Sequence, residues 1–225
     1  MTTTTPLLAY CVQEQDELTG GFVFARSSAE ARRVGSQQFG SGDFAWGRAR
    51  RAQWADKYAP GPVPKLAMID HGWWFECHGC QIKICDDMRD EETDDPLDLK
   101  PVEYGSAIYC SEACRDDWLE ERRQRRFEEA VAIAELSALL AERLPGIEIV
   151  ARDGHLVPHA YVVRQADGSW APQQCSVGFT FPGCKVGLAS YRYDKIGEEP
   201  RVSVCNGDLD AWNEWRAAQI PANAA

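Results

Sequence analysis

The sequence predicts an α+β protein with a small N-terminal ββαβ unit, a cysteine-bearing module that runs into a long helix, and a C-terminal antiparallel sheet with a terminal helix. Three observations predict this class. Residues 1–59 combine short apolar runs with one helix-capping signal. Residues 112–143 form an unbroken helical stretch without proline or glycine. From residue 146 onward, short strand-like runs alternate with turn dipeptides.

The N-terminal unit is predicted from its turn and capping signals. Gly20-Gly21 forms a turn between two apolar runs, which predicts a strand pair. Ser27 and Glu30 make a capping box, and Gly40 marks the end of the helix that this box starts. The expected elements are strands at 7–12 and 22–25, a helix at 28–39, and a third extended segment at 43–51.

Prolines mark the first boundary in the chain. Pro60-Gly61-Pro62-Val63-Pro64 has three prolines in five residues, which excludes a helix or a central strand at this point. We therefore expect four segments along the chain. They are an N-terminal α/β unit at 1–59, a cysteine-bearing knuckle module at 60–117, a long amphipathic helix at 118–145 and a β-rich domain at 146–225.

The long helix is predicted to begin after the cap residue Ser111 and to stop at Pro145-Gly146. Residues 120–126, in its first half, include no apolar side chain, so this part is solvated or bound to a partner. The second half has apolar residues at helical spacing. The expected apolar face consists of Phe127, Val131, Ala134, Ala138 and Ala141, with Ala130, Ile133, Leu140 and Leu144 beside it.

The C-terminal domain is predicted to be an antiparallel sheet, because turn dipeptides such as Asp167-Gly168 and Pro182-Gly183 separate its apolar runs. A terminal helix at about 208–218 presents Leu209, Trp212 and Trp215. The expected strands lie at 147–151, 159–164, 175–181, 186–193 and 202–205.

Four of the nine cysteines lie in two close pairs, which predicts a metal site. Cys77 and Cys80 form a C-x2-C pair, and Cys110 and Cys114 form a C-x3-C pair at the start of the long helix. Zinc favours four tetrahedral ligands, and thiolates at these spacings can reach one ion. We therefore expect one structural Zn²⁺. Four thiolates leave no open coordination position for catalysis.

Neighbouring residues refine this zinc hypothesis. Gly79 is expected to supply the positive-φ backbone of a tight knuckle. His78 and Cys85 are the alternative ligands. A knuckle, an insertion and a second ligand pair at a helix N-terminus make a treble-clef layout. The segment Tyr109-Cys110-Ser111-Glu112-Ala113-Cys114 resembles the second knuckle of several treble-clef families.

A wider resemblance covers roughly the first half of the chain. Phe22-Val23-Phe24-Ala25 and Arg48-Ala49-Arg50-Arg51-Ala52 resemble the N-terminal segment of uncharacterised bacteriophage and prophage proteins, in which a zinc knuckle follows. Residues 72–80 resemble that knuckle. The resemblance implies a phage origin and assigns no activity.

Composition excludes several classes of protein. No apolar run is long enough to cross a bilayer, and the N-terminus lacks the features of a signal peptide, so we expect a location in the cytoplasm. The net charge is −11, which disfavours a general polyanion binder. The other cysteines are expected to be small core residues, although a turn before Cys184 and Lys185 beside it are conditions that can lower a thiol pKa. Those five cysteines are Cys11, Cys85, Cys175, Cys184 and Cys205.

Charged runs offer candidate partner contacts. The basic candidates for a nucleic-acid or partner contact are Arg48, Arg50, Arg51, Arg122, Arg123, Arg125 and Arg126. Acidic residues flank the helical arginines at i,i+4-type spacing, which favours a solvated face there. The acidic insertion at 86–98 could contact a basic partner through Asp90, Glu91, Glu92, Asp94 and Asp95, or could serve solubility alone.

The sequence has no P-loop, dinucleotide fingerprint, nucleophile elbow or HExxH motif, and we identify no catalytic residues. We expect a non-enzymatic, zinc-binding accessory protein of a phage that acts by binding another protein. A more specific form of this hypothesis is that the chain inhibits a host defence enzyme or a nucleic-acid enzyme. The alternative is a nucleic-acid-binding regulatory module that uses the zinc finger and the arginine-rich segments, although the net charge disfavours it. No membrane partner is expected.

Overall fold

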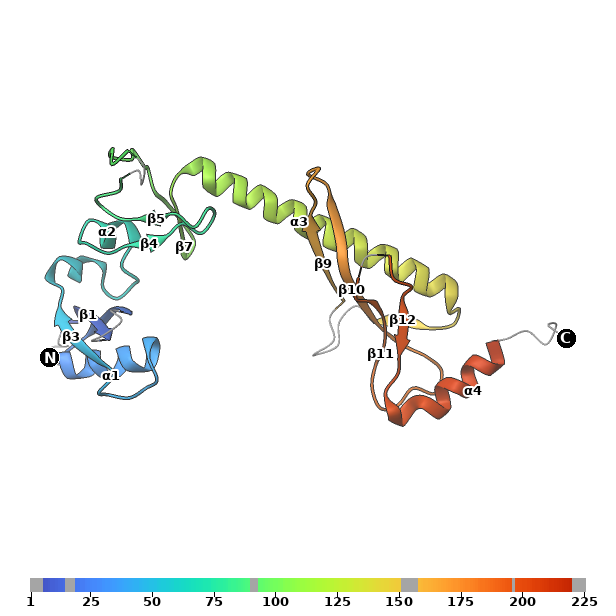
Figure 1. Ribbon diagram of the computed structural model, residues 1–225. Helices are drawn as coiled ribbons and strands as arrows, with labels where there is room; N and C mark the ends of the chain where they lie inside the picture. Colours follow the sequence, from blue (N-terminus) through green and yellow to red (C-terminus); the bar gives the residue numbers. More distant parts are fainter. Residues whose placement is uncertain (1–5, 15–18, 90–92, 151–157, 196, 220–225) are drawn as a thin grey trace. The chain divides into compact units, whose positions relative to one another are not determined.

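The structure is a computed structural model that describes residues 6–14, 19–89, 93–150, 158–195 and 197–219. It is a mixed α+β protein with antiparallel sheets and a long helix, which confirms the predicted class (Figure 1). The chain forms two compact units, residues 1–116 and 117–225. The four segments expected from the sequence are a finer division than these two units.

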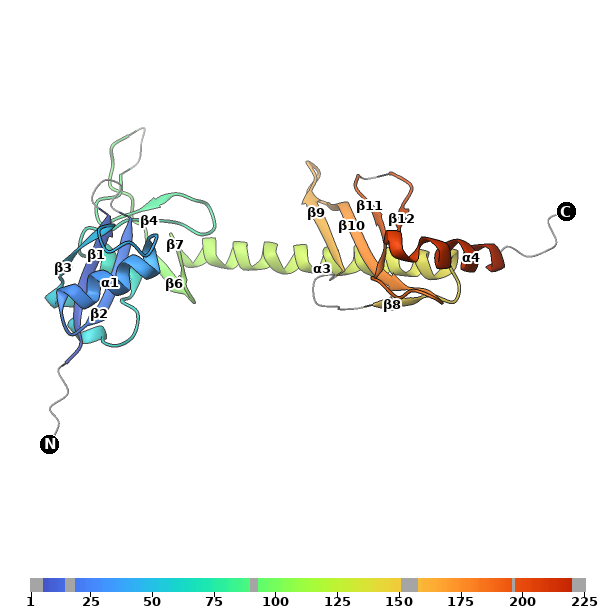
Figure 2. The ribbon, with the colours of Figure 1, turned by 90° about the horizontal axis from the view of Figure 1, so that it is seen from below.

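The N-terminal unit begins with the expected ββαβ order. Strands β1 (Leu8–Glu14), β2 (Gly20–Ala25) and β3 (Gly47–Arg51) form an antiparallel sheet in the order β2-β1-β3. Helix α1 (Ser28–Phe39) packs along one face of this sheet (Figure 2). The Ser27 hydroxyl accepts a hydrogen bond from the backbone N–H of Glu30, and the Glu30 carboxylate accepts one from the N–H of Arg26, so these two residues fix the start of α1.

The opposite face of this sheet carries a second core. It is covered by the 3-10 helix η1 (Gln53–Tyr58) and the short helix α2 (Lys65–Ile69). The buried members of this core are Ala9, Ala52, Ala55, Val63 and Met68. Residues on both sides of the proline-rich stretch therefore share one core.

Short hairpins carry the cysteines. Strands β4 (Phe75–Glu76) and β5 (Lys83–Ile84) pair with each other, as do β6 (Val102–Tyr104) and β7 (Ala107–Tyr109). These four strands and α2 lie in the stretch before Cys110 for which the sequence predicts no regular element. Helix α3 (Glu112–Arg143) follows at once and has the bounds that the cap and the terminal proline predict.

The C-terminal unit is an antiparallel sheet packed against helices. Strand β10 (Trp170–Thr180) is central and pairs with β11 (Ala189–Tyr193) on one side and with β8 (Glu148–Val150) and β9 (His159–Arg164) on the other. Strand β12 (Arg201–Ser203) continues the sheet beyond β11. A 3-10 turn, η2 (Asn206–Asp208), leads into helix α4 (Leu209–Gln219). The core joins Val177 and Phe179 of the sheet to Leu140 of α3 and Trp215 of α4.

The centre of the apolar face expected for α3 is wrong, although Leu140 and Leu144, expected beside it, are buried. Phe127 is 61% exposed, and the alanines Ala134, Ala138 and Ala141 are also exposed. The buried side chains of α3 are Ala132, Leu136 and Leu140, and Leu144 just after the helix continues this spacing of four residues. The leucines determine the orientation of the helix, because each buries far more apolar area than an alanine does.

Candidate metal centre

The two cysteine pairs meet in the N-terminal unit. The Sγ atoms of Cys77 and Cys114 are 3.5 Å apart, and those of Cys80 and Cys110 are 3.6 Å apart. All four sulfur atoms lie within 4.8 Å of one another. A tetrahedral ion with metal–sulfur bonds of 2.3 Å would place its ligands about 3.8 Å apart. The four cysteines could therefore hold a metal ion.

The first pair lies in the turn of the β4–β5 hairpin. The N–H of Cys77 donates to the carbonyl of Ile82 (2.8 Å), and the N–H of Gln81 donates to the carbonyl of Cys77 (2.9 Å). The residue with positive φ in this turn is Gln81, at 65°, and not Gly79 as the sequence predicts. Gly79 has a different role, because a Cβ built there would lie 2.6 Å from the Cys114 Sγ. Only glycine leaves this room for the ligand.

The second pair is fixed by the end of β7 and the first turn of α3. The Ser111 hydroxyl accepts a hydrogen bond from the N–H of Cys114 at 3.1 Å. The N–H of Cys110 donates to the Cys77 Sγ at 3.3 Å, and the N–H of His78 donates to the carbonyl of Ile108 at 2.9 Å. These two bonds tie the knuckle to β7, so the two cysteine pairs are positioned against each other by the backbone.

The surroundings of Cys77 favour a thiolate. Burial raises the pKa of its thiol, but the backbone N–H groups of Cys80, Cys110 and Gly79 outweigh burial and lower this pKa to about 6. Burial and the neighbouring thiols raise the pKa of Cys110 and of Cys114. Four crowded sulfur atoms cannot all ionise without a cation among them, and a metal ion would supply that charge.

The two alternative ligands stand outside this cluster. Within the described part of the chain, the group of side chains placed to share an ion contains the four cysteines, and it contains neither His78 nor Cys85. The ring of His78 packs edge-on against Tyr109, with 5.7 Å between centroids. The thiol of Cys85 is half-buried just after β5.

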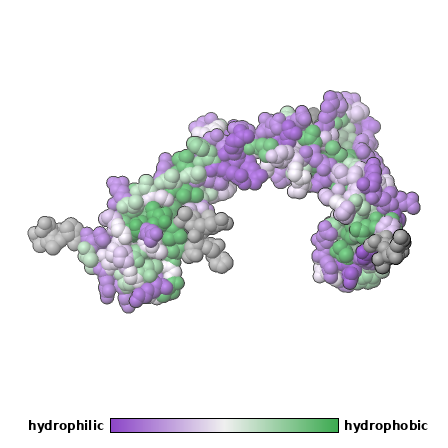
Figure 3. Space-filling view, turned by 180° about the vertical axis from the view of Figure 1, so that it is seen from behind, coloured by the Kyte–Doolittle hydropathy of each residue, from purple (hydrophilic) through white to green (hydrophobic). Residues whose placement is uncertain are grey.

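The basic candidate residues have different environments. Arg48 and Arg50 are exposed on β3, whereas Arg51 pairs with Asp56 and donates to the carbonyl of Ala9. On α3, Arg123 pairs with Glu120, and Arg125 pairs with Glu121. Arg122 lies over the Trp118 ring, and Arg126 is exposed. Hydrophilic side chains dominate the surface of this part of α3 (Figure 3).

Two of the five acidic candidate residues in the insertion lie within the described part of the chain. Asp94 and Asp95 are exposed, and the Arg89 guanidinium lies 3.8 Å from the Asp94 carboxylate. Asp90, Glu91 and Glu92 lie outside the described residues.

Asp208 is a buried carboxylate that sequence reasoning missed. It is 2% exposed, and its oxygens accept the backbone N–H groups of Lys185, Val186 and Gly187. The Cys184 thiol lies 3.6 Å from this carboxylate. Burial and the charge of Asp208 raise the pKa of Cys184, so Lys185 beside it does not lower this pKa.

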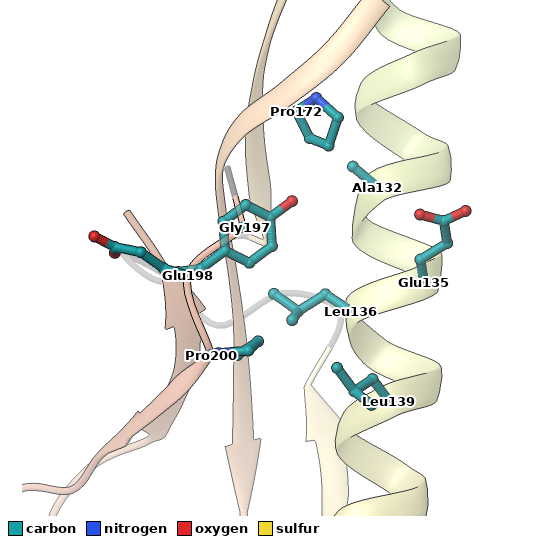
Figure 4. A pocket seen from close by; sticks show the side chains of 9 residues that line it. Ala132, Glu135, Leu136, Leu139, Pro172, Gly197, Glu198 and Pro200 are labelled. Atoms are coloured by element: carbon teal, nitrogen blue, oxygen red, sulfur yellow. The ribbon is translucent and has the colours of Figure 1, made fainter. Parts of the chain in front are cut away.

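A cavity of about 310 Å³ lies between α3 and the sheet of the C-terminal unit. Leu136 and Leu139 line it from α3, and Pro172 and Pro200 from the sheet side. Figure 4 shows the Leu136 side chain toward the strands, whereas the carboxylates of Glu135 and Glu198 point away from the space. Tyr193 also lines the cavity, which is otherwise mostly apolar apart from the two glutamates, and we assign it no function.

Comparisons with protein-family models, with curated proteins and with solved structures found no match. Among the described helices, none is both long enough and apolar enough to span a membrane.

Proposed function

We propose that this chain is a non-enzymatic zinc-binding protein whose Zn²⁺ is structural. The observation that carries the proposal is the convergence of four cysteine sulfurs within 4.8 Å. Four thiolates match the preference of zinc and leave no coordination position for a substrate. The surrounding strands have only two or three residues each, so they contribute little stability of their own. Metal binding would supply much of the folding free energy here.

The order of elements supports a treble-clef assignment within this proposal. A knuckle between β4 and β5 provides the first two ligands. The β6–β7 hairpin follows, and the second pair sits at the end of β7 and in the first turn of α3. Knuckle, hairpin and helix in this order are the parts of a treble clef.

We further propose that the module acts by binding another protein. Large apolar side chains are exposed on the elements around the cysteines, where burial against a partner would remove them from water. Trp74 and Tyr104 are each 55% exposed, Leu66 is 38% exposed and Ile82 is 37% exposed. The resemblance to phage proteins supports a bacterial host protein as partner, and a defence or nucleic-acid enzyme is the sharper form of this proposal.

Two measurements test the proposed function. Reduced protein purified without chelator should contain one zinc ion per chain, and protein without metal would contradict the structural role. For partner binding, wild type and Trp74→Ser should be compared in capture from bacterial lysate, with Phe44→Ser as the control for an exposed aromatic elsewhere. A specific partner should be retained by wild type and Phe44→Ser and lost by Trp74→Ser. Equal retention by all three would contradict the proposed surface.

A further inference from the structure

One face of the N-terminal sheet combines arginine and aromatic side chains. Strand register places Phe22 of β2, Cys11 of β1 and Arg50 of β3 in one row across the sheet. The next row brings Gln13 beside Arg48. Helix α1 covers the opposite face, whereas η1 and α2 pack against this one and leave Cys11 and Phe22 half-buried. We call this surface the arginine–aromatic face, and it consists of Cys11, Phe22, Arg48, Arg50, Trp54 and Trp73.

A cavity of about 510 Å³ opens on this face. Phe22 lies between two indole rings in its wall, with its centroid 5.2 Å from Trp54 and 5.3 Å from Trp73. Cys11 and Ala52 add apolar surface, and the exposed Gln53 adds an amide with donor and acceptor atoms. Arg51 also lines the cavity, so its wall joins aromatic rings to polar groups. Such a space suits a planar heterocycle with hydrogen-bonding edges.

Two further arginines lie on β3, and Arg50 stands opposite Cys11 of the cavity wall. Arg48 and Arg50 are exposed, and neither has an ion-pair partner among the described residues. Arg51 differs, because Asp56 neutralises it. Residues 1–60 carry a net charge of +1 in a chain whose net charge is −11. Arg48 and Arg50 are two residues apart on a strand, so their Cα atoms are about 6.6 Å apart.

We propose that the arginine–aromatic face binds single-stranded nucleic acid, with one base in the aromatic cavity and adjacent phosphates on Arg48 and Arg50. Aromatic stacking requires a base that is not already stacked in a duplex, which favours a single strand. Two arginines at this spacing can each contact one of two successive phosphates. An acidic peptide would use the arginines but has no group that needs a flat aromatic cavity.

The test uses the full chain loaded with zinc and a labelled single strand of about eight nucleotides, followed by fluorescence anisotropy. Two phosphate contacts predict a slope of about −1.4 for log K against log salt. Arg48→Gln/Arg50→Gln should remove this slope. Between about 50 mM and 1 M salt the slope corresponds to a loss of about 60-fold in affinity, so the double variant should bind about 60-fold more weakly than wild type at about 50 mM salt. Arg122→Gln/Arg123→Gln is the matched control and should bind as wild type does.

Stacking has its own readout. A bound base should quench tryptophan fluorescence. Two indoles line the cavity, and one ring face of Trp54 already stacks on His71, so Trp54→Phe and Trp73→Phe should each lose part of this quenching while keeping zinc content and thermal unfolding. The proposal is overturned if the strand does not bind at low salt, or if the Arg48/Arg50 double variant binds as wild type does. It is equally overturned if a duplex of the same sequence binds as tightly, or if a poly-glutamate peptide competes on equal terms.

Discussion

Replacing Gly79 by alanine should disable the metal centre through a single methyl group. The added Cβ would lie 2.6 Å from the Cys114 Sγ and 3.2 Å from the Cys114 carbonyl oxygen. Ordinary contact begins at 3.4 Å, so the sulfur would have to retreat by about 0.8 Å. Metal–ligand distances tolerate changes of only about 0.2 Å. We therefore expect zinc affinity to fall by about 100-fold, which is about 2.7 kcal/mol.

The assay is competition for zinc between the reduced protein and a chromogenic chelator. Gly61→Ala is the matched control, because its Cβ would meet no atom closer than the Tyr58 carbonyl oxygen at 3.6 Å. The control should keep wild-type affinity. If Gly79→Ala binds zinc as tightly as Gly61→Ala, then the close approach of Gly79 to Cys114 does not position the ligand, and the reasoning fails.

Three further predictions concern stability. The pKa of Asp56 is lowered chiefly by the hydrogen bond from Arg51, so the stability that this carboxylate contributes is present at neutral pH and is lost as the pH falls through its folded pKa. Asp56→Asn should accordingly lower the melting temperature at pH 7, and this difference from wild type should shrink as the pH falls through the lowered pKa. Leu140→Ala removes a fully buried side chain from the C-terminal core and should cost about 3–5 kcal/mol in urea unfolding, and a cost below about 1 kcal/mol would contradict that burial. Arg123→Gln breaks only an exposed pair with Glu120, so calorimetry should detect a change below about 1 kcal/mol.

Local signals in the sequence predict the helices well. The capping signals at Ser27 and Ser111 each mark the start of a helix, and the bounds predicted for α1 and α3 agree with the structure. These signals are reliable because they depend on hydrogen bonds between near neighbours. The cysteine spacing likewise identifies the four sulfurs that come together. The helix caps act within a few residues, and each cysteine pair is recognised by its own short spacing.

Features that depend on tertiary packing could not be predicted in this way. Periodicity identifies α3 as amphipathic, but the buried stripe through Leu136 and Leu140 is selected by the sheet that it packs against. The role of Gly79 depends on Cys114, which lies 35 residues further along the chain. The arginine–aromatic face requires the strand order β2-β1-β3, which brings Phe22 and Arg50 into one row. No local pattern contains this pairing.

The closeness of the cysteine sulfurs has a consequence for redox chemistry. Cys77 with Cys114, and Cys80 with Cys110, are near enough to form disulfides if no ion separates them. Each bond would release two protons and pass two electrons to an oxidant such as molecular oxygen. Both bonds would join the knuckle to the second pair and leave no thiolate for zinc. The ion would thus protect the thiols that bind it, and air would convert the metal-free chain into a cross-linked form that a reductant must open before zinc can enter.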